Sequence, residues 1–218
     1  MESVGNIPVR RVVKRSTVRV VGYHASRKMK CLVPWESQIE RDYFEWLEVD
    51  PNVIEFYAQP ETFRFPNIKY TPDALVITHQ GDFFAEVKPD KVLECAEDMD
   101  RLARIEQAFR ATGRYFRLIL ERDVRAQPLR SNIIVLNRYR RRRVSDEHRT
   151  LLQQVLAEAA LSFHEITNRT GLRQGVLMQG IAQGFLAIDL NQEFTAETTV
   201  TIQRGRLSDD TCEVGGWE

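Results

Sequence analysis

Two acidic residues and a lysine near the middle of the 218-residue sequence have the types and spacing for metal-dependent phosphate chemistry. Asp73 follows Pro72, and the triplet Glu86-Val87-Lys88 begins thirteen residues later. Two carboxylates and the Val87 carbonyl would form an all-oxygen site suited to Mg²⁺, with Mn²⁺ as a substitute. A neighbouring ammonium can orient or polarise an attacking water. The set therefore predicts hydrolysis of phosphodiester bonds.

The same residues also fit structural roles that involve no chemistry. Glu86 and Lys88 match the solvated face of an ordinary strand, and an aspartate after a proline often sits in a turn. The context favours the chemical interpretation, because a hairpin is expected between Asp73 and Glu86 and apolar neighbours such as Phe83 would bury the other face of the strand. Since side chains alternate along a strand, Glu86 and Lys88 are expected on one face and Val87 in the core.

A third candidate acid is Glu40, which lies in a predicted helix upstream of these strands. It stands three residues after Ser37, so the pair forms a Ser-x-x-Glu capping box that would do nothing but begin the helix. Glu36 and Glu45 lie on the same element. Spacing alone does not choose among the three glutamates.

Segments on both sides of these residues indicate an α/β fold. Apolar residues at three- and four-residue spacing predict a helix that opens near Trp35 and closes at Pro51. Three strands separated by turn formers predict an antiparallel meander. After it come a long amphipathic helix, a fourth strand and another helix. The predicted strands are 62–69, 73–78, 82–88 and 115–120, and these later helices are 91–112 and 131–138. This order indicates a mixed sheet flanked by helices.

A second, smaller domain is expected after the arginine-rich run 138–143, which breaks the pattern. Helices are predicted from Asp146 to about Ala160, from the capping box Ser162-x-x-Glu165, and over 173–183, and two strands over 185–190 and 198–203. This order is the winged-helix layout. The predicted domains are a basic arm over 1–21, a catalytic domain over 22–143, a winged helix over 144–206 and an acidic, disordered tail over 207–218.

Charge is distributed unevenly along the chain, although 31 basic and 31 acidic residues cancel overall. Residues 1–143 hold 26 basic and 20 acidic residues, whereas residues 144–218 hold 5 and 11. The first part is therefore the expected partner of a polyanion such as double-stranded DNA. The alternative is a basic arm that is merely solvated. The predicted DNA contacts in the arm are Arg10, Arg11, Lys14 and Arg15.

Cysteine usage and hydropathy predict a soluble protein of a reducing compartment, the cytoplasm. Cys31, Cys95 and Cys212 stand far apart, so neither a disulfide framework nor a zinc knot has a usable spacing. No stretch approaches the roughly 18 apolar residues of a membrane span, and the basic N-terminus lacks the apolar segment of an export signal.

Several short motifs follow one another in the first part of the chain. They are Gly22-Tyr23-His24-Ala25-Ser26-Arg27-Lys28, Glu36-Ser37-x-x-Glu40-Arg41-Asp42, Leu47-Glu48-x-Asp50-Pro51-x-Val53, Gln59-Pro60, Tyr70-Thr71-Pro72-Asp73 and Glu86-Val87-Lys88-Pro89. Together they resemble the N-terminal domain of the TnsA family of transposon-end endonucleases. The resemblance runs from about Gly22 to Arg125, and the C-terminal layout agrees with it.

This resemblance implies a restriction-endonuclease-like, PD-(D/E)XK fold that cuts the strand at each 5′ end of a mobile element. It makes Glu40, Asp73, Glu86 and Lys88 the active site. Asp73 is then expected to bridge two Mg²⁺ ions, with Glu86 and the Val87 carbonyl completing one, Glu40 supporting the other, and Lys88 steadying the water and the developing charge. Signature residues that add expected DNA contacts are Arg27, Lys28 and Gln59.

The resemblance also implies partners: a TnsB-like transposase, which cuts and joins the 3′ ends, and a TnsC-like regulatory ATPase. Because the winged-helix region is net acidic, protein contact is at least as well supported there as base reading. Two other interpretations stay open. One is a stand-alone phage or repair nuclease of the same fold, and the other is a non-catalytic DNA-binding or scaffold protein in which Asp73 and Glu86 are structural.

Overall fold

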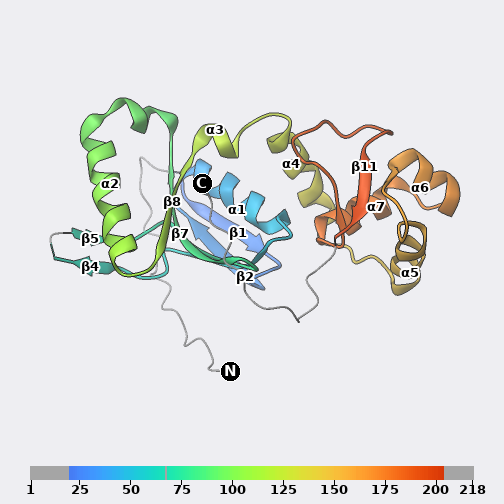
Figure 1. Ribbon diagram of the computed structural model, residues 1–218, viewed down its shortest axis with the longest axis horizontal. Helices are drawn as coiled ribbons and strands as arrows, with labels where there is room; N and C mark the ends of the chain where they lie inside the picture. The colour runs from blue at the N-terminus through green and yellow to red at the C-terminus, as the bar shows by residue number, and fades with distance from the viewer. Residues whose placement is uncertain (1–19, 67, 204–218) are drawn as a thin grey trace, which may run out of the picture.

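The computed structural model describes residues 20–66 and 68–203, so the predicted contacts Arg10, Arg11, Lys14 and Arg15 and the predicted tail 207–218 lie outside the described residues. Figure 1 shows an elongated molecule in which residues 96–111 lie toward one end of the long axis and residues 146–182 toward the other. The elements of the first part are β1 Gly22–Ser26, β2 Cys31–Trp35, α1 Gln38–Val49, β3 Val53–Ala58, β4 Phe63–Phe65, β5 Ile68–Tyr70, β6 Ala74–Thr78, β7 Gly81–Lys88, the 3₁₀ helix η1 Asp90–Glu94, α2 Ala96–Ala111, β8 Tyr115–Leu120, α3 Glu121–Val124 and α4 Leu129–Tyr139.

A mixed sheet forms the centre of this part, as predicted, and its four strands have the order β3-β6-β7-β8. The first three strands pair antiparallel, and β8 joins β7 in parallel. Residues of β7 alternate between the two faces: Phe83 packs toward α1 with Phe44, whereas Phe84 packs toward α2 with Phe109. Helices α1 and α2 therefore cover opposite faces of the sheet (Figure 1).

The prediction that Thr62–Lys69 forms the first strand of the meander is wrong. That segment divides into β4 and the start of β5, which pair with each other as a separate two-stranded sheet. Pro66 follows the last residue of β4 and cannot donate a ladder hydrogen bond, which is consistent with the break. The strand beside β6 is instead β3, and the register shift between Val53 and Glu55 disrupts the alternation that would have marked it.

Other elements also differ from their predicted bounds. The segment predicted as one helix from Lys91 starts as the 3₁₀ helix η1, and α2 begins only at Ala96. The hairpin of β1 and β2 was not predicted at all. Its first residue, Gly22, lies so close to the Trp35 ring that a Cβ atom there would fall 2.4 Å from a ring carbon. The hairpin packs on α1 through Val33 and Trp35.

The C-terminal part contains α5 Asp146–Val155, β9 Leu161–Ser162, α6 Phe163–Thr170, α7 Gln174–Ala182, β10 Leu186–Ala187 and β11 Thr199–Ile202. The three short strands form one antiparallel sheet in the order β10-β11-β9. The predicted helices and the last two strands are present with shorter bounds, and β9 adds a strand that was not predicted. Ser162 caps α6 in a complete capping box with Glu165.

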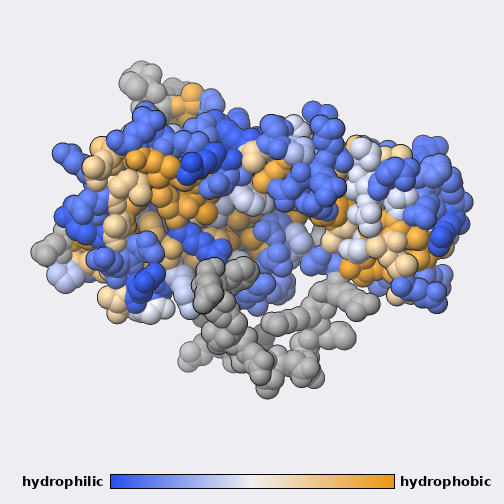
Figure 2. Space-filling model, turned by 45° about the horizontal axis from the view of Figure 1, so that its top comes forward, coloured by the Kyte–Doolittle hydropathy of each residue, from blue (hydrophilic) through white to orange (hydrophobic). Residues whose placement is uncertain are grey.

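Helix α4 connects the two parts of the molecule. Its Ile133 and Leu136 belong to the same buried cluster as Leu152 of α5 and Leu177 of α7, and Val49 of α1 joins that cluster. None of the helices among the described residues is long and apolar enough to cross a membrane. Figure 2 shows a face that is largely hydrophilic, with hydrophobic side chains gathered in separate patches.

Candidate active site

The pairing of β6 with β7 places Asp73 beside the Glu86-Val87-Lys88 triplet. Ala74, the first residue of β6, is opposite Ala85, so Asp73 lies level with the end of β7. The Val87 backbone N–H donates a hydrogen bond of 2.8 Å to Asp73 Oδ2. Lys88 Nζ lies 2.5 Å from Glu86 Oε1 and 3.9 Å from Asp73 Oδ2. Three of the predicted site residues therefore meet directly at one end of the sheet.

Glu40 lies at the N-terminal end of α1 and is buried. Ser37 caps the helix by accepting from the Glu40 backbone N–H, while Glu40 Oε2 accepts a hydrogen bond of 2.8 Å from the Glu36 backbone. The capping role is therefore real, but the carboxylate also acts electrostatically on the site: its charge raises the pKa of Asp73, after the larger effects of burial and Glu86. Glu45, in contrast, is bound 2.7 Å from Arg130.

Negative charge exceeds positive charge in this buried site. Burial first, and the charge of Glu86 next, raise the pKa of Asp73 well above its usual range, against the opposing effect of Lys88. Burial also raises the pKa of Glu40. Burial would lower the pKa of Lys88, but Asp73 and Glu86 outweigh it and raise that pKa. The Lys88 ammonium thus balances only part of the charge of three carboxylates. The raised pKa values of Asp73 and Glu40 mean that ionising these two groups costs free energy in the folded protein.

Tyr70 is part of the site although the sequence indicated only a turn residue there. Its hydroxyl and Glu86 Oε2 are both buried, and neither has a hydrogen-bond partner among the described residues. Burial, followed by the charge of Glu86, raises the pKa of Tyr70. The tyrosine is the last residue of β5, so its position depends on the β4–β5 hairpin that the strand pattern misassigned. The motif Tyr70-Thr71-Pro72-Asp73 was the one available signal.

Divalent-metal binding is compatible with the donors at this end of the sheet, although no ion is held by a preformed cage. Among residues 20–66 and 68–203, no group of three or more His, Cys, Asp or Glu side chains is close enough to hold a metal ion. Asp73 and Glu86 nevertheless supply two adjacent hard oxygen donors, and Glu86 Oε2 is a buried acceptor that lacks a donor. Mg²⁺ commonly takes only one or two carboxylates and completes its coordination with water and phosphate. The chemistry of the donors therefore fits.

Gln59 touches the site through its backbone. Its N–H donates a hydrogen bond of 2.9 Å to the Asp73 carbonyl, and its φ of 43° lies in the left-handed region that non-glycine residues rarely adopt. A strained residue that holds the backbone of a site acid is often a functional feature. Its predicted contact with DNA stays a prediction.

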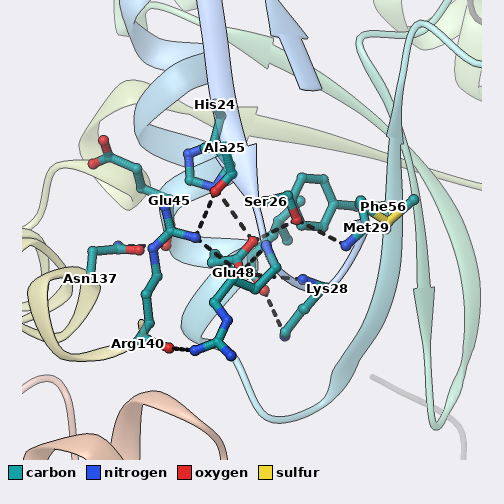
Figure 3. A network of polar contacts seen from close by, with 12 residues as sticks. His24, Ala25, Ser26, Lys28, Met29, Glu45, Glu48, Phe56, Asn137 and Arg140 are labelled. Atoms are coloured by element: carbon teal, nitrogen blue, oxygen red, sulfur yellow. Dashed lines mark hydrogen bonds and ion pairs between the residues drawn. The ribbon is translucent and has the colours of Figure 1, made fainter. Parts of the chain in front are cut away.

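The other predicted DNA contacts among the described residues, Arg27 and Lys28, lie in the turn of the β1–β2 hairpin and contact other residues of the protein. Figure 3 shows Lys28 beside Glu48. Lys28 Nζ donates to three carbonyl oxygens where α1 ends: those of Leu47 at 2.8 Å, Val53 at 2.7 Å and Asp50. Burial lowers the pKa of Lys28 to about 8. Its three ammonium protons are therefore already used at the C-terminus of α1.

Glu48, near the end of α1, is the centre of the same network (Figure 3). Its carboxylate accepts from Ser26 Oγ at 2.7 Å and from the Arg27 backbone at 2.9 Å, and it lies 3.4 Å from His24 Nε2 and 3.3 Å from Arg140 Nη1. Burial alone would raise the pKa of Glu48, but these donors lower it to about 2. Apart from the family motifs, no sequence pattern indicated this cluster.

Comparison with protein families supports a nuclease. Residues 50–121 match the family described as TnsA-like endonuclease N terminal. No curated protein matches the chain significantly. The match confirms the resemblance seen in the motifs. Its segment contains Asp73, Glu86 and Lys88, and Glu40 lies outside it.

Proposed function

We propose that the chain is a divalent-metal-dependent DNA endonuclease of a TnsA-like transposition system, which cuts the 5′ ends of a mobile element. One observation carries the proposal. The segment that matches a TnsA-like endonuclease contains the two acids and the lysine that meet at the end of the sheet, where Lys88 lies within 3.9 Å of both carboxylates.

In this proposal Asp73 and Glu86 hold Mg²⁺ or Mn²⁺, and Glu40 adds negative charge from the start of α1. The bound ion would supply a more acidic water and neutralise charge on the phosphate. Without an ion, Asp73 and Glu86 outweigh burial and raise the pKa of Lys88, which favours its charged form. It therefore acts as a fixed cation that can donate to the attacking water or to a phosphate oxygen, and not as a base.

The C-terminal part is proposed to be a winged helix that contacts partner proteins. In support, α5, β9, α6, α7, β10 and β11 follow the helix, strand, helix, helix, strand, strand order of that module. The segment between β10 and β11 exposes Glu193 and Glu197, which disfavours contact with DNA phosphates. The proposed partners are a TnsB-like transposase and a TnsC-like ATPase. Loss of co-purification in Glu193→Lys/Glu197→Lys would support this role, and unchanged co-purification would oppose it.

Nicking of supercoiled plasmid in Mn²⁺ or Mg²⁺, alone and with the partner transposase, tests the nuclease. Wild type and Asp82→Asn should nick, because Asp82 is an exposed acid near the other end of β7. Asp73→Asn and Glu86→Gln should not. Equal nicking by Asp73→Asn and wild type would remove the assigned site. Mapping the cut strand separates a transposon-end nuclease from a stand-alone nuclease, since only the former should favour the 5′ ends of the element.

A further inference from the structure

The arginine-rich run Arg138–Arg143 carries positive charge that the proposed active site does not use. Five of its six residues are arginines, and it joins the end of α4 to α5. Arg138, Arg141, Arg142 and Arg143 are exposed. Among residues 20–66 and 68–203, no carboxylate forms an ion pair within 4 Å of any of these four guanidinium groups. Their charge is therefore available to a partner.

The fifth arginine, Arg140, holds the run in place. It is buried, its Nη1 donates a hydrogen bond of 2.7 Å to the Ala25 carbonyl, and the same atom lies 3.3 Å from Glu48 Oε1. Its own carbonyl accepts from the Arg27 side chain (Figure 3). Farther along, the Arg142 carbonyl accepts from the side chain of Gln183. Because the backbone is fixed at two points, its exposed arginines project from a defined turn.

A groove of about 570 Å³ lies between this run and α1, and Arg41, Arg130, Arg138 and Arg141 all line it. The acid in the groove, Glu45, is already neutralised by Arg130 at 2.7 Å. Arg130 also lies 2.7 Å from Asp42, as does Arg41. Glu45 of the groove and the neighbouring Asp42 are thus matched by Arg41, Arg125 and Arg130. The guanidinium groups of Arg138 and Arg141 add uncompensated positive charge.

The groove and the proposed active site share helix α1. Arg41 directly follows Glu40, and the groove extends along the helix to Glu45, whose carbonyl accepts a hydrogen bond of 3.1 Å from Asn137 of α4. At 1.5 Å of rise per residue, Arg41 and Glu45 are about 6 Å apart along the helix axis. The groove therefore runs along α1 toward the helix turn that contains Glu40.

We infer that this groove, with Arg138 and Arg141 as its principal contacts, binds the phosphate backbone of DNA beside the bond that is cut. Guanidinium groups form paired, charge-assisted hydrogen bonds with phosphate oxygens, and such contacts position DNA without reading its sequence. The choice of DNA over an acidic protein surface rests on the proposed function, because the groove begins one residue after a proposed site acid.

The test compares two double variants that remove the same charge. Arg138→Gln/Arg141→Gln alters the groove, whereas Arg104→Gln/Arg110→Gln alters exposed arginines of α2, each of which is paired with an acid four residues away. Affinity for a labelled DNA duplex is measured by fluorescence anisotropy at several salt concentrations without Mg²⁺ or Mn²⁺. The groove variant should lose affinity by about tenfold or more, and its log–log salt slope should become shallower by about 1.8.

The control variant should keep the wild-type slope and lose affinity by no more than about twofold. Arg138→Lys/Arg141→Lys should recover most of the salt slope but less of the DNA affinity. Lysine keeps the positive charge but lacks the paired N–H donors of a guanidinium group. Equal behaviour of the two glutamine variants, or no DNA binding by wild type, would overturn the inference. Equal thermal unfolding of the variants would show that the exposed substitutions leave folding intact.

The binding test and the nuclease test fail separately. If wild type binds DNA through these arginines but never nicks it in Mn²⁺, the groove stands and the nuclease proposal fails. If wild type nicks DNA and the groove variant binds as tightly as wild type, the nuclease stands and the groove is wrong. An acidic protein surface is then the remaining candidate for the run.

Discussion

Helix α1 carries a buried glutamate near each end, and the two differ in the donors around them. Glu40, at the start of the helix, has a raised pKa because of burial. Glu48, near the end, has a pKa lowered to about 2 because hydrogen bonds and Arg140 outweigh burial. The helix dipole acts in the opposite sense, since it favours a negative charge at the N-terminus. Local donors therefore decide the state of each acid.

Glu48 is therefore a structural acid whose charge is balanced, whereas Glu40 belongs to a site with excess negative charge. Ser26, the Arg27 backbone, His24 and Arg140 surround Glu48, and its negative charge holds a hairpin turn, a helix end and a linker together. The Glu40 end has one ammonium for three carboxylates. A buried excess of negative charge costs stability unless a cation joins it, and a divalent ion is the partner that suits oxygen donors.

The largest expected effect is on cutting at the Glu40 end. Asp73→Asn keeps the shape of the side chain but removes one of the two adjacent carboxylates, so nicking in Mn²⁺ should fall on the order of 1,000-fold. Glu48→Gln should retain the cutting of the folded protein at saturating DNA. The measurement is the single-turnover rate of plasmid nicking. Comparable losses in both variants would break the distinction between the two ends.

The next effect is on stability, and it is expected at the Glu48 end and not at the Glu40 end. Glu48→Gln should lower the free energy of unfolding by about 3 kcal/mol, because it leaves Arg140 buried without its carboxylate. Glu40→Gln should leave the metal-free protein as stable as wild type or more stable, because it removes a buried charge that repels its neighbours. Urea unfolding in a chelator measures both. A Glu40→Gln protein less stable than Glu48→Gln would contradict the account.

Acid unfolding should depend on Glu48. Its pKa is about 2 in the folded protein and 4.5 ordinarily, so its stabilising effect is present above pH 4.5 and lost as pH falls toward 2. Wild type should lose up to about 3 kcal/mol across this window from Glu48 alone. Glu48→Gln should lack that part of the pH dependence, and Glu40→Gln should keep it. Urea unfolding at a series of pH values provides the curves, and parallel curves for wild type and Glu48→Gln would oppose the assignment.

The smallest effect concerns two residues with a left-handed backbone conformation, one near the Glu40 end of α1 and one near the Glu48 end. Gln59 has φ 43° beside Asp73, and Lys30 has φ 54° in the β1–β2 turn. Glycine relieves that strain, so each substitution to glycine should stabilise the protein by about 0.5–1 kcal/mol. Thermal unfolding and nicking rates test the pair. Both glycine variants should cut at the wild-type rate, because glycine keeps the backbone N–H that binds the Asp73 carbonyl; slower cutting by Gln59→Gly alone would show that the Gln59 side chain acts in the site.

The sequence predicted the parts of the site that depend on local periodicity. Alternation along β7 placed Glu86 and Lys88 on one face, and the short connection to β6 brought Asp73 beside them. Spacing left Glu36, Glu40 and Glu45 equivalent, and only the packed structure shows that Glu45 is bound to Arg130 while Glu40 acts on Asp73. That distinction arises from partners on other elements.

Features that depend on long-range contacts were missed. Tyr70 reaches the site through a hairpin whose strands were taken as one, and β3 was obscured by its register shift. Lys28 was expected on DNA, but its ammonium lies on carbonyls of residues 19 to 25 positions later in the chain. No pattern within a helix or strand encodes such a contact, so the sequence did not show that this ammonium has partners within the protein; its contact with DNA stays a prediction.

Calorimetry of metal binding tests whether Asp73 and Glu86 form a divalent-metal site. It requires neither the partners nor a cleavable substrate. Mn²⁺ and Mg²⁺ are titrated into wild type, Asp73→Ala/Glu86→Ala and the control Glu55→Ala/Asp82→Ala, with Ca²⁺ as a non-catalytic ion. The account predicts saturable binding in wild type and the control that is lost in the Asp73→Ala/Glu86→Ala protein. Identical traces for all three proteins would contradict it and would favour a scaffold role in which Asp73 and Glu86 are structural.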